Sequence, residues 1–63
     1  MNVTDVLVDE LDKKVEQLKD WIASGQAEDY VSYQKTCGEI RGLLIARGYT
    51  LDLKQNLENS DNE

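Results

Sequence analysis

The chain contains no histidine and no proline, and it has a single cysteine among its 63 residues. Without histidine, most zinc sites and the usual partner of a catalytic cysteine are excluded. One cysteine cannot form a disulfide within the chain. A chain of this length buries only about 60% of the surface that its unfolded form exposes. Since it has neither a disulfide nor a metal site to add stability, we expect it to be oligomeric.

Basic residues and long apolar runs are also scarce. There are 7 lysines and arginines against 13 acidic residues, which gives a net charge of -6. This balance disfavours direct binding to nucleic acid, whose phosphates are held by basic side chains, and it favours basic partners. No apolar run approaches the roughly 18 residues that span a membrane. Met1–Thr4 carries no secretory or lipidation pattern, so we expect a soluble intracellular protein that does not bind membranes.

The first third of the chain has the spacing of one helix, which we place at about residues 3–24. Asn2 or Thr4 can cap its start, because either side-chain oxygen can accept a hydrogen bond from a free amide. Gly25 ends it, since glycine adopts the left-handed conformation there without a side-chain penalty. A face of this width packs on one neighbouring helix. Its apolar residues are Leu7, Val8, Leu11, Val15, Leu18 and Ile22.

A second helix is predicted at about residues 27–58, with Glu28 and Asp29 in its first turn, where negative charge is favourable. No proline interrupts it. Gly48 is a possible break, because Thr50 could cap a new short helix after it. The short connection makes the two helices antiparallel neighbours. The expected fold is an all-α, antiparallel two-helix hairpin over residues 1–58, followed by a disordered acidic tail over residues 59–63.

The predicted second helix is longer than the first. If residue 24 faces residue 27 across the turn, the first helix ends level with Gly48, and residues 49–58 have no partner in the chain. This overhang contains Leu51, Leu53 and Leu57, and burial of one leucine contributes roughly 1.5 to 3 kcal/mol. We therefore predict that the chain either folds back at Gly48 or meets another subunit or another protein through the overhang.

A line of small residues and an apolar face run along the second helix. Gly38, Gly42 and Ala46 recur at every fourth position, which lets another helix approach the backbone closely; this neighbour is either the first helix or another subunit. The nearby charges exclude a membrane dimer motif. The apolar face consists of Tyr30, Tyr33, Cys37, Ile40, Leu44 and Leu51, with Cys37 expected in the core. The predicted interface consists of Tyr33, Gly38, Gly42, Ala46, Tyr49, Leu51, Leu53 and Leu57.

Acidic residues form a ridge along the first helix, consisting of Asp5, Asp9, Asp12, Glu16 and Asp20. Their spacing per charge is about 5 to 6 Å, close to that of successive phosphates on a nucleic-acid strand, so the ridge could mimic DNA. A solvated helix face is the simpler interpretation, because neighbouring lysines dilute the charge. The sequence has no recognisable catalytic set, phosphate loop or metal-ligand spacing. We therefore expect no enzymatic activity, no cofactor and no bound metal.

Residues 18–53 resemble a group of small, mostly uncharacterised proteins of tailed bacteriophages. The matching positions are Gly25, Ala27, Asp29, Tyr30, Tyr33, Gly38, Ile40, Gly42, Leu43, Leu51, Asp52 and Leu53. Such proteins are often encoded among head and packaging genes. The resemblance therefore implies a non-enzymatic virion-associated or assembly protein. It would form a homo-oligomer or bind a larger capsid or portal protein through the second helix.

A different function class is also compatible with the sequence. In this alternative the chain is a small host-takeover inhibitor in the host cytoplasm. Its acidic ridge would occupy a basic nucleic-acid-binding surface of a host enzyme.

Overall fold

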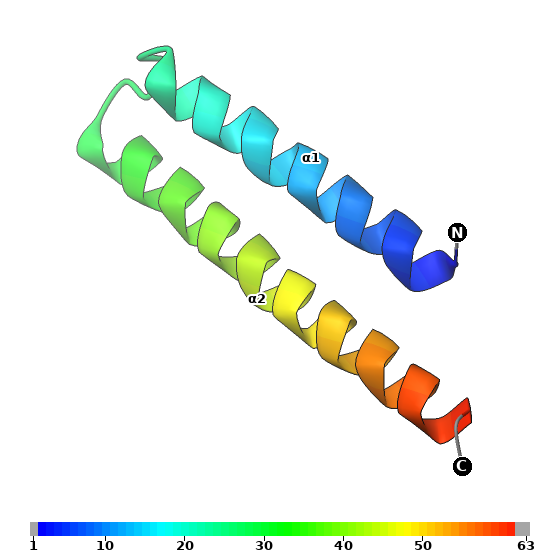
Figure 1. The fold of residues 1–63 in the computed structure, drawn as a ribbon. Coiled ribbons are helices and arrows are strands. Elements are labelled where there is room, and N and C mark those ends of the chain that lie inside the picture. Colours follow the sequence, from blue (N-terminus) through cyan, green and yellow to red (C-terminus); the bar gives the residue numbers. More distant parts are fainter. Residues whose placement is uncertain (1, 62–63) are drawn as a thin grey trace.

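The computed structural model describes residues 2–61, and it contains two helices, α1 (Val3–Ala23) and α2 (Tyr30–Asp61). They lie side by side and run in opposite directions, joined by residues 24–29 (Figure 1). No strand occurs among residues 2–61. The prediction of an all-α, antiparallel two-helix hairpin is therefore confirmed.

Both ends of α1 are fixed by the residues that the sequence singled out. Asn2 has an extended backbone, and its Oδ1 accepts a hydrogen bond from the amide of Asp5 at 2.9 Å, so it is the N-cap. At the other end Gly25 has a φ of +78° and its amide donates to the carbonyl of Ile22 at 3.1 Å. This left-handed residue turns the chain out of the helix. The helix ends at Ala23, one residue before the predicted end.

The start of α2 lies at Tyr30 and not at residue 27. Asp29 is the reason, because its Oδ1 accepts a hydrogen bond from the amide of Ser32 at 2.7 Å. An N-cap residue has non-helical backbone angles, so the helix begins after it rather than before it. The same hydrogen bond lowers the pKa of the Asp29 carboxyl.

From Tyr30 the helix continues through Gly48 without a break and extends to Asp61. One glycine costs a helix only about 1 kcal/mol relative to alanine, which is too little to interrupt a helix of this length. Residues 59–61, predicted to be disordered, are helical. The part of that prediction that concerns residues 62 and 63 lies outside the described residues.

The seam between the helices is apolar on one side and largely polar on the other. In α1 the only buried apolar side chain is Val15, and it is flanked by half-buried Val8, Leu11, Leu18 and Ile22. The least exposed residues of α2 along the seam are Thr36, Ile40, Leu43, Arg47, Thr50 and Lys54. In both helices these positions alternate in steps of three and four, as in a coiled coil. The Thr50 hydroxyl donates to the carbonyl of Ala46 at 2.8 Å, so its burial leaves no unpaired polar group.

Two ion pairs cross the seam and set the register of the helices. The Nε of Arg47 lies 2.7 Å from Oδ1 of Asp12, and Nζ of Lys54 lies 2.5 Å from Oδ1 of Asp5. Lys54 lowers the pKa of the Asp5 carboxyl, and Asp5 raises the pKa of the Lys54 amine. The start of α1 thus lies beside Lys54. The prediction that residues 49–58 have no partner in the chain is wrong, because the connection of residues 24–29 is longer than assumed and shifts the register.

The hairpin is one helix layer thick, with overall dimensions of 52 × 19 × 11 Å. Stable domains usually bury each helix face against a second layer. Here both broad sides of the hairpin are uncovered, and the surface of α2 outside the seam is available to other molecules.

Candidate interaction surface on α2

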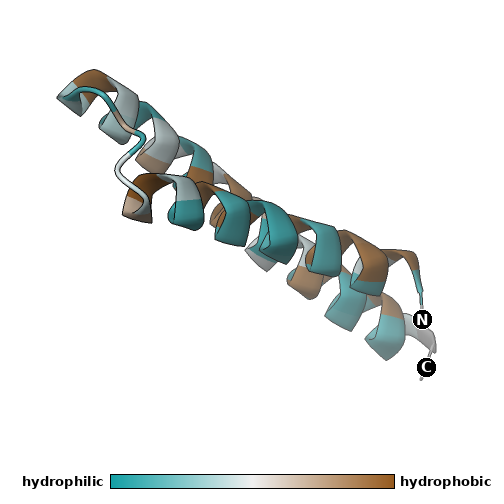
Figure 2. Ribbon diagram, turned by 90° about the horizontal axis from the view of Figure 1, so that it is seen from above, coloured by the Kyte–Doolittle hydropathy of each residue, from teal (hydrophilic) through white to brown (hydrophobic). Residues whose placement is uncertain are grey.

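Most large apolar side chains of α2 lie outside the seam and are exposed. They are Tyr30, Val31, Tyr33, Leu44, Ile45, Tyr49, Leu51, Leu53 and Leu57. In α1 the exposed large apolar side chains are confined to the first two turns, at Val3, Val6 and Leu7. Figure 2 shows the outward side of α1 in front, hydrophilic over the middle of the helix and hydrophobic at its ends. Exposed apolar surface is therefore concentrated on α2.

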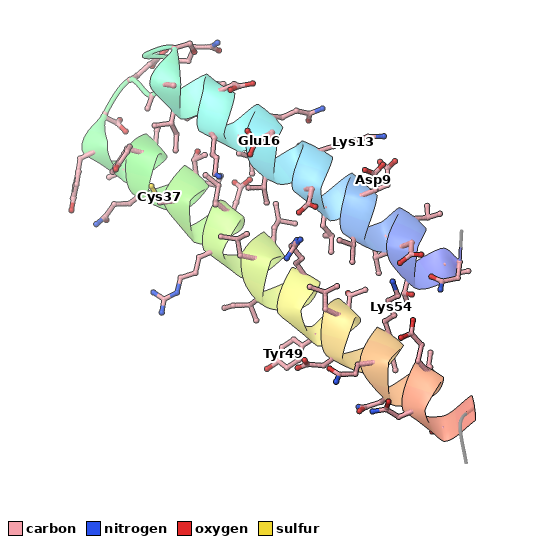
Figure 3. All side chains as sticks on the ribbon, in the orientation of Figure 1. Asp9, Lys13, Glu16, Cys37, Tyr49 and Lys54 are labelled. Carbon is pink, nitrogen blue, oxygen red and sulfur yellow. The ribbon has the colours of Figure 1, made fainter. Side chains whose placement is uncertain are left out.

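Helical spacing places most of these residues of α2 on two stripes. The tyrosine stripe consists of Tyr30, Tyr33, Cys37, Leu44 and Leu51 and borders the seam. The glycine stripe consists of Gly38, Gly42, Ile45, Tyr49 and Leu53 and faces away from α1. In Figure 3 the side chain of Tyr49 points away from α1, whereas that of Lys54 points toward it.

The tyrosine stripe has local order of its own. The rings of Tyr30 and Tyr33 are stacked, with centroids 6.4 Å apart, and Nε2 of Gln34 donates to the Tyr30 hydroxyl at 2.7 Å. The Cys37 thiol raises the pKa of the Tyr33 phenol. Cys37 itself is half-buried at the border of the seam, so the expectation that it is a core residue is wrong. The side of α2 that faces α1 carries Arg47 and Lys54 instead, because these residues pair with Asp12 and Asp5 of α1.

The glycines of the glycine stripe are open to solvent. A Cβ atom placed on Gly38 or Gly42 would meet no atom within 4 Å. These glycines therefore do not receive α1, which excludes one of the two neighbours that the sequence left open. Ala46 is half-buried at the edge of the stripe.

Leu51 and Leu53 of the predicted overhang are exposed because of the side of α2 that they occupy, not because α1 is too short. Leu51 belongs to the tyrosine stripe and Leu53 to the glycine stripe. Leu57 lines a hollow at the open end of the hairpin together with Val3 and Thr4 of α1. The eight predicted interface residues thus fall on two stripes and one end of α2, and they form no single site.

The acidic ridge of α1 is largely neutralised. Asp5 and Asp12 take part in the two seam ion pairs. Lys13 lies 3.1 Å from Asp9, which raises the pKa of the lysine, and Lys19 lies 3.5 Å from Glu16. Figure 3 shows Asp9 and Lys13 together on α1. Among the ridge residues, Asp20 alone has no ion pair within residues 2–61.

The seam ion pairs are the feature that the sequence reasoning missed. A signal for them was present, because Asp5 and Asp12 are seven residues apart, and so are Arg47 and Lys54. Opposite charges that repeat with the period of a coiled coil on two antiparallel helices predict paired positions.

Neither a metal site nor a membrane span is found in the described part of the chain. Residues 2–61 contain no group of three or more histidine, cysteine or acidic side chains that could hold a metal ion. None of the described helices is both long enough and apolar enough to cross a bilayer.

Comparison of the chain with family models, with curated proteins and with solved structures gives no match. The resemblance to bacteriophage proteins therefore depends on the residues of this chain alone.

Proposed function

We propose that this chain is a non-enzymatic assembly protein of a tailed bacteriophage particle. It multimerises or binds a larger capsid or portal protein through α2. The observation that carries the proposal is the concentration of exposed apolar side chains on α2, on a hairpin that is one helix layer thick. Contiguous exposed apolar surface on a small protein marks an interaction site.

The surface area of the hairpin supports this interpretation. The hairpin exposes 4995 Å², whereas a compact monomer of 7.2 kDa exposes about 4100 Å². The excess of about 900 Å² is close to the roughly 800 Å² that one partner contributes to a stable protein interface. An interface of ordinary size on α2 would remove this excess.

The positions that carry the resemblance to bacteriophage proteins include residues that the hairpin itself does not need. Gly25 and Asp29 are needed by the hairpin itself, as the left-handed residue after α1 and as the cap of α2. Gly38 and Gly42 have no such role within the hairpin. In mid-helix each glycine destabilises by about 0.8 to 1 kcal/mol relative to alanine, which is compensated only where something packs against it.

Leu53→Asp tests the proposal, because Leu53 is exposed in the hairpin and its replacement leaves the seam intact. We expect the variant to keep its helix content and to associate at least about tenfold more weakly, since a charge replaces an apolar contact. Sedimentation velocity over a concentration series measures the association. Gln17→Asp, an exposed substitution on α1, is the matched control and should associate like the wild type.

Mass spectrometry of purified particles tests the virion placement separately. The expected result is a stoichiometric amount of this chain in particles or in assembly intermediates. If the wild-type chain is a monomer and is absent from both, the proposed function is wrong.

A further inference from the structure

We infer that two copies of this chain pair through their glycine stripes, with the α2 helices antiparallel and related by a two-fold axis. Tyr49 of each copy fills the space at Gly42 of the other, and Leu53 fills the space at Gly38. This inference rests on the proposed function and specifies one mode of association within it. A second copy is the occupant because both halves of the contact are present on one stripe.

The stripe presents both bulky side chains and empty space. Tyr49 is 72% exposed and Leu53 is 53% exposed. A Cβ at Gly38 or Gly42 would contact nothing within 4 Å, so both positions are open and carry no side chain that would hold a neighbouring helix away. Helices pack by inserting the side chains of one into the gaps on the surface of the other. The glycine stripe therefore carries both the bulky side chains that would insert into a partner helix and the glycine positions that would receive the partner's side chains.

In one antiparallel register, both bulky side chains of each copy lie opposite glycines of the other copy. Gly42 and Tyr49 are equidistant from a point between Ile45 and Ala46, and Gly38 and Leu53 are equidistant from the same point. When two copies are related by a two-fold axis through that point, residues at equal distances from it lie opposite each other. Both bulky residues then face glycines at once. A parallel pair in register would instead place tyrosine against tyrosine and glycine against glycine, which leaves a clash and a void.

The charges beside the stripe favour the same register. Arg41 and Asp52 lie on the same edge of the stripe, and neither forms an ion pair within residues 2–61. In a two-fold antiparallel pair, each edge meets the same edge of the other copy. Side chains on a helix lean toward its N-terminus, which brings Arg41 to the level of Asp52 of the other copy. The pairing thus joins opposite charges twice, once on each side of the axis.

Gly42→Leu tests the inference, because it fills the space that Tyr49 is proposed to occupy. We expect the dissociation constant of the dimer to rise by about tenfold or more, while the helix content of the monomer stays equal or increases. Gly48→Leu is the matched control, since Gly48 is also open but lies off the stripe. It should raise helix content similarly and change the dissociation constant by less than about twofold. Sedimentation equilibrium and circular dichroism measure the two quantities. Equal weakening by both substitutions would overturn the inference.

A charge exchange tests the register without changing the packing. Arg41→Asp and Asp52→Arg should each raise the dissociation constant by about threefold or more, and the double variant should return it to within about twofold of the wild type. A double variant no tighter than either single variant would contradict the proposed register.

Cysteine crosslinking tests the orientation of the helices. In a Cys37→Ser background, Ile45→Cys places a thiol next to the two-fold axis and should crosslink under mild oxidation. Tyr49→Cys places the two thiols about 10 Å apart along the helices, beyond the reach of a disulfide. Efficient crosslinking of Tyr49→Cys would indicate a parallel pair and overturn the inference.

The proposed function and this inference can fail separately. A wild-type chain that remains a monomer at millimolar concentration would refute the self-pairing. If that monomer is still found in particles, the proposed function holds and α2 binds a larger protein.

Discussion

The two helices of the hairpin use their surfaces in opposite ways. α1 places apolar residues such as Val15 in the seam together with the paired carboxylates of Asp5 and Asp12, and most of its other polar residues lie outside. α2 places Thr36, Thr50 and charged side chains in the seam and exposes its tyrosines and leucines. An amphipathic helix normally buries its apolar side. α1 thus buries most of its apolar surface in the seam, whereas α2 leaves most of its apolar surface exposed.

The largest effect is expected on the free energy of unfolding, when one valine of each helix is replaced. Val15→Asp should lower the free energy of unfolding by about 3 kcal/mol or more, because it buries an unpaired charge in the seam. Val31→Asp, on the exposed side of α2, should change it by less than about 0.5 kcal/mol. Thermal melts followed by far-UV circular dichroism compare the two. Similar losses would mean that the two helices do not differ in the proposed way.

A smaller effect is expected when the polar seam of α2 is made apolar. Thr50→Val should raise the free energy of unfolding by about 0.5 to 1 kcal/mol, because a buried methyl replaces a hydroxyl. That hydroxyl bonds only the Ala46 carbonyl of its own helix. Urea unfolding measures the change. A loss of stability would show that the seam of α2 requires its polar groups.

Acidification should weaken both the seam and the start of α2. The pKa values of Asp5 and Asp29 are lowered in the folded chain, so these carboxylates stabilise it above their unfolded pKa of about 3.9. The stabilisation is lost as the pH falls through the lower folded values. The melting temperature should therefore fall from about pH 5 downward. In a variant with Asp5→Asn and Asp29→Asn the decline should be shallower, and an unchanged decline would contradict these assignments.

The smallest effect on the hairpin is expected from the outer part of the acidic ridge. Changing Asp9, Glu16 and Asp20 to lysine leaves both seam ion pairs in place and should leave self-association within about threefold of the wild type. The same variant tests the alternative function. If the chain inhibits a host enzyme by covering a basic nucleic-acid-binding surface, this change should abolish that binding, measured by titration against the purified enzyme.

The two helices of the hairpin could be predicted from the sequence because residues close together in the chain determine where each helix forms. Helical spacing, the Asn2 cap and Gly25 all act within a few residues. The start of α2 was placed too early, because an aspartate suits both a first turn and a cap, and Asp29 is the cap. Capping is decided by a single hydrogen bond that spacing does not reveal.

The side of α2 that meets α1 could not be predicted from apolar spacing. That spacing selects the tyrosine stripe, but the seam is fixed by charge pairs between residues far apart in the chain, such as Arg47 and Asp12. The register follows from the same pairs, and for this reason the predicted overhang of residues 49–58 was wrong. The exposure of Leu53 has a different origin, which is its position around the helix axis.

The continuity of α2 through Gly48 has a mechanical consequence. At about 1.5 Å per residue, Tyr30–Asp61 forms a stiff rod about 48 Å long. The orientation of one end of this helix fixes the orientation of the other end, because the helix has no break between them. Side chains at the two ends of α2 are therefore held at a fixed separation, even though the chain weighs only 7.2 kDa.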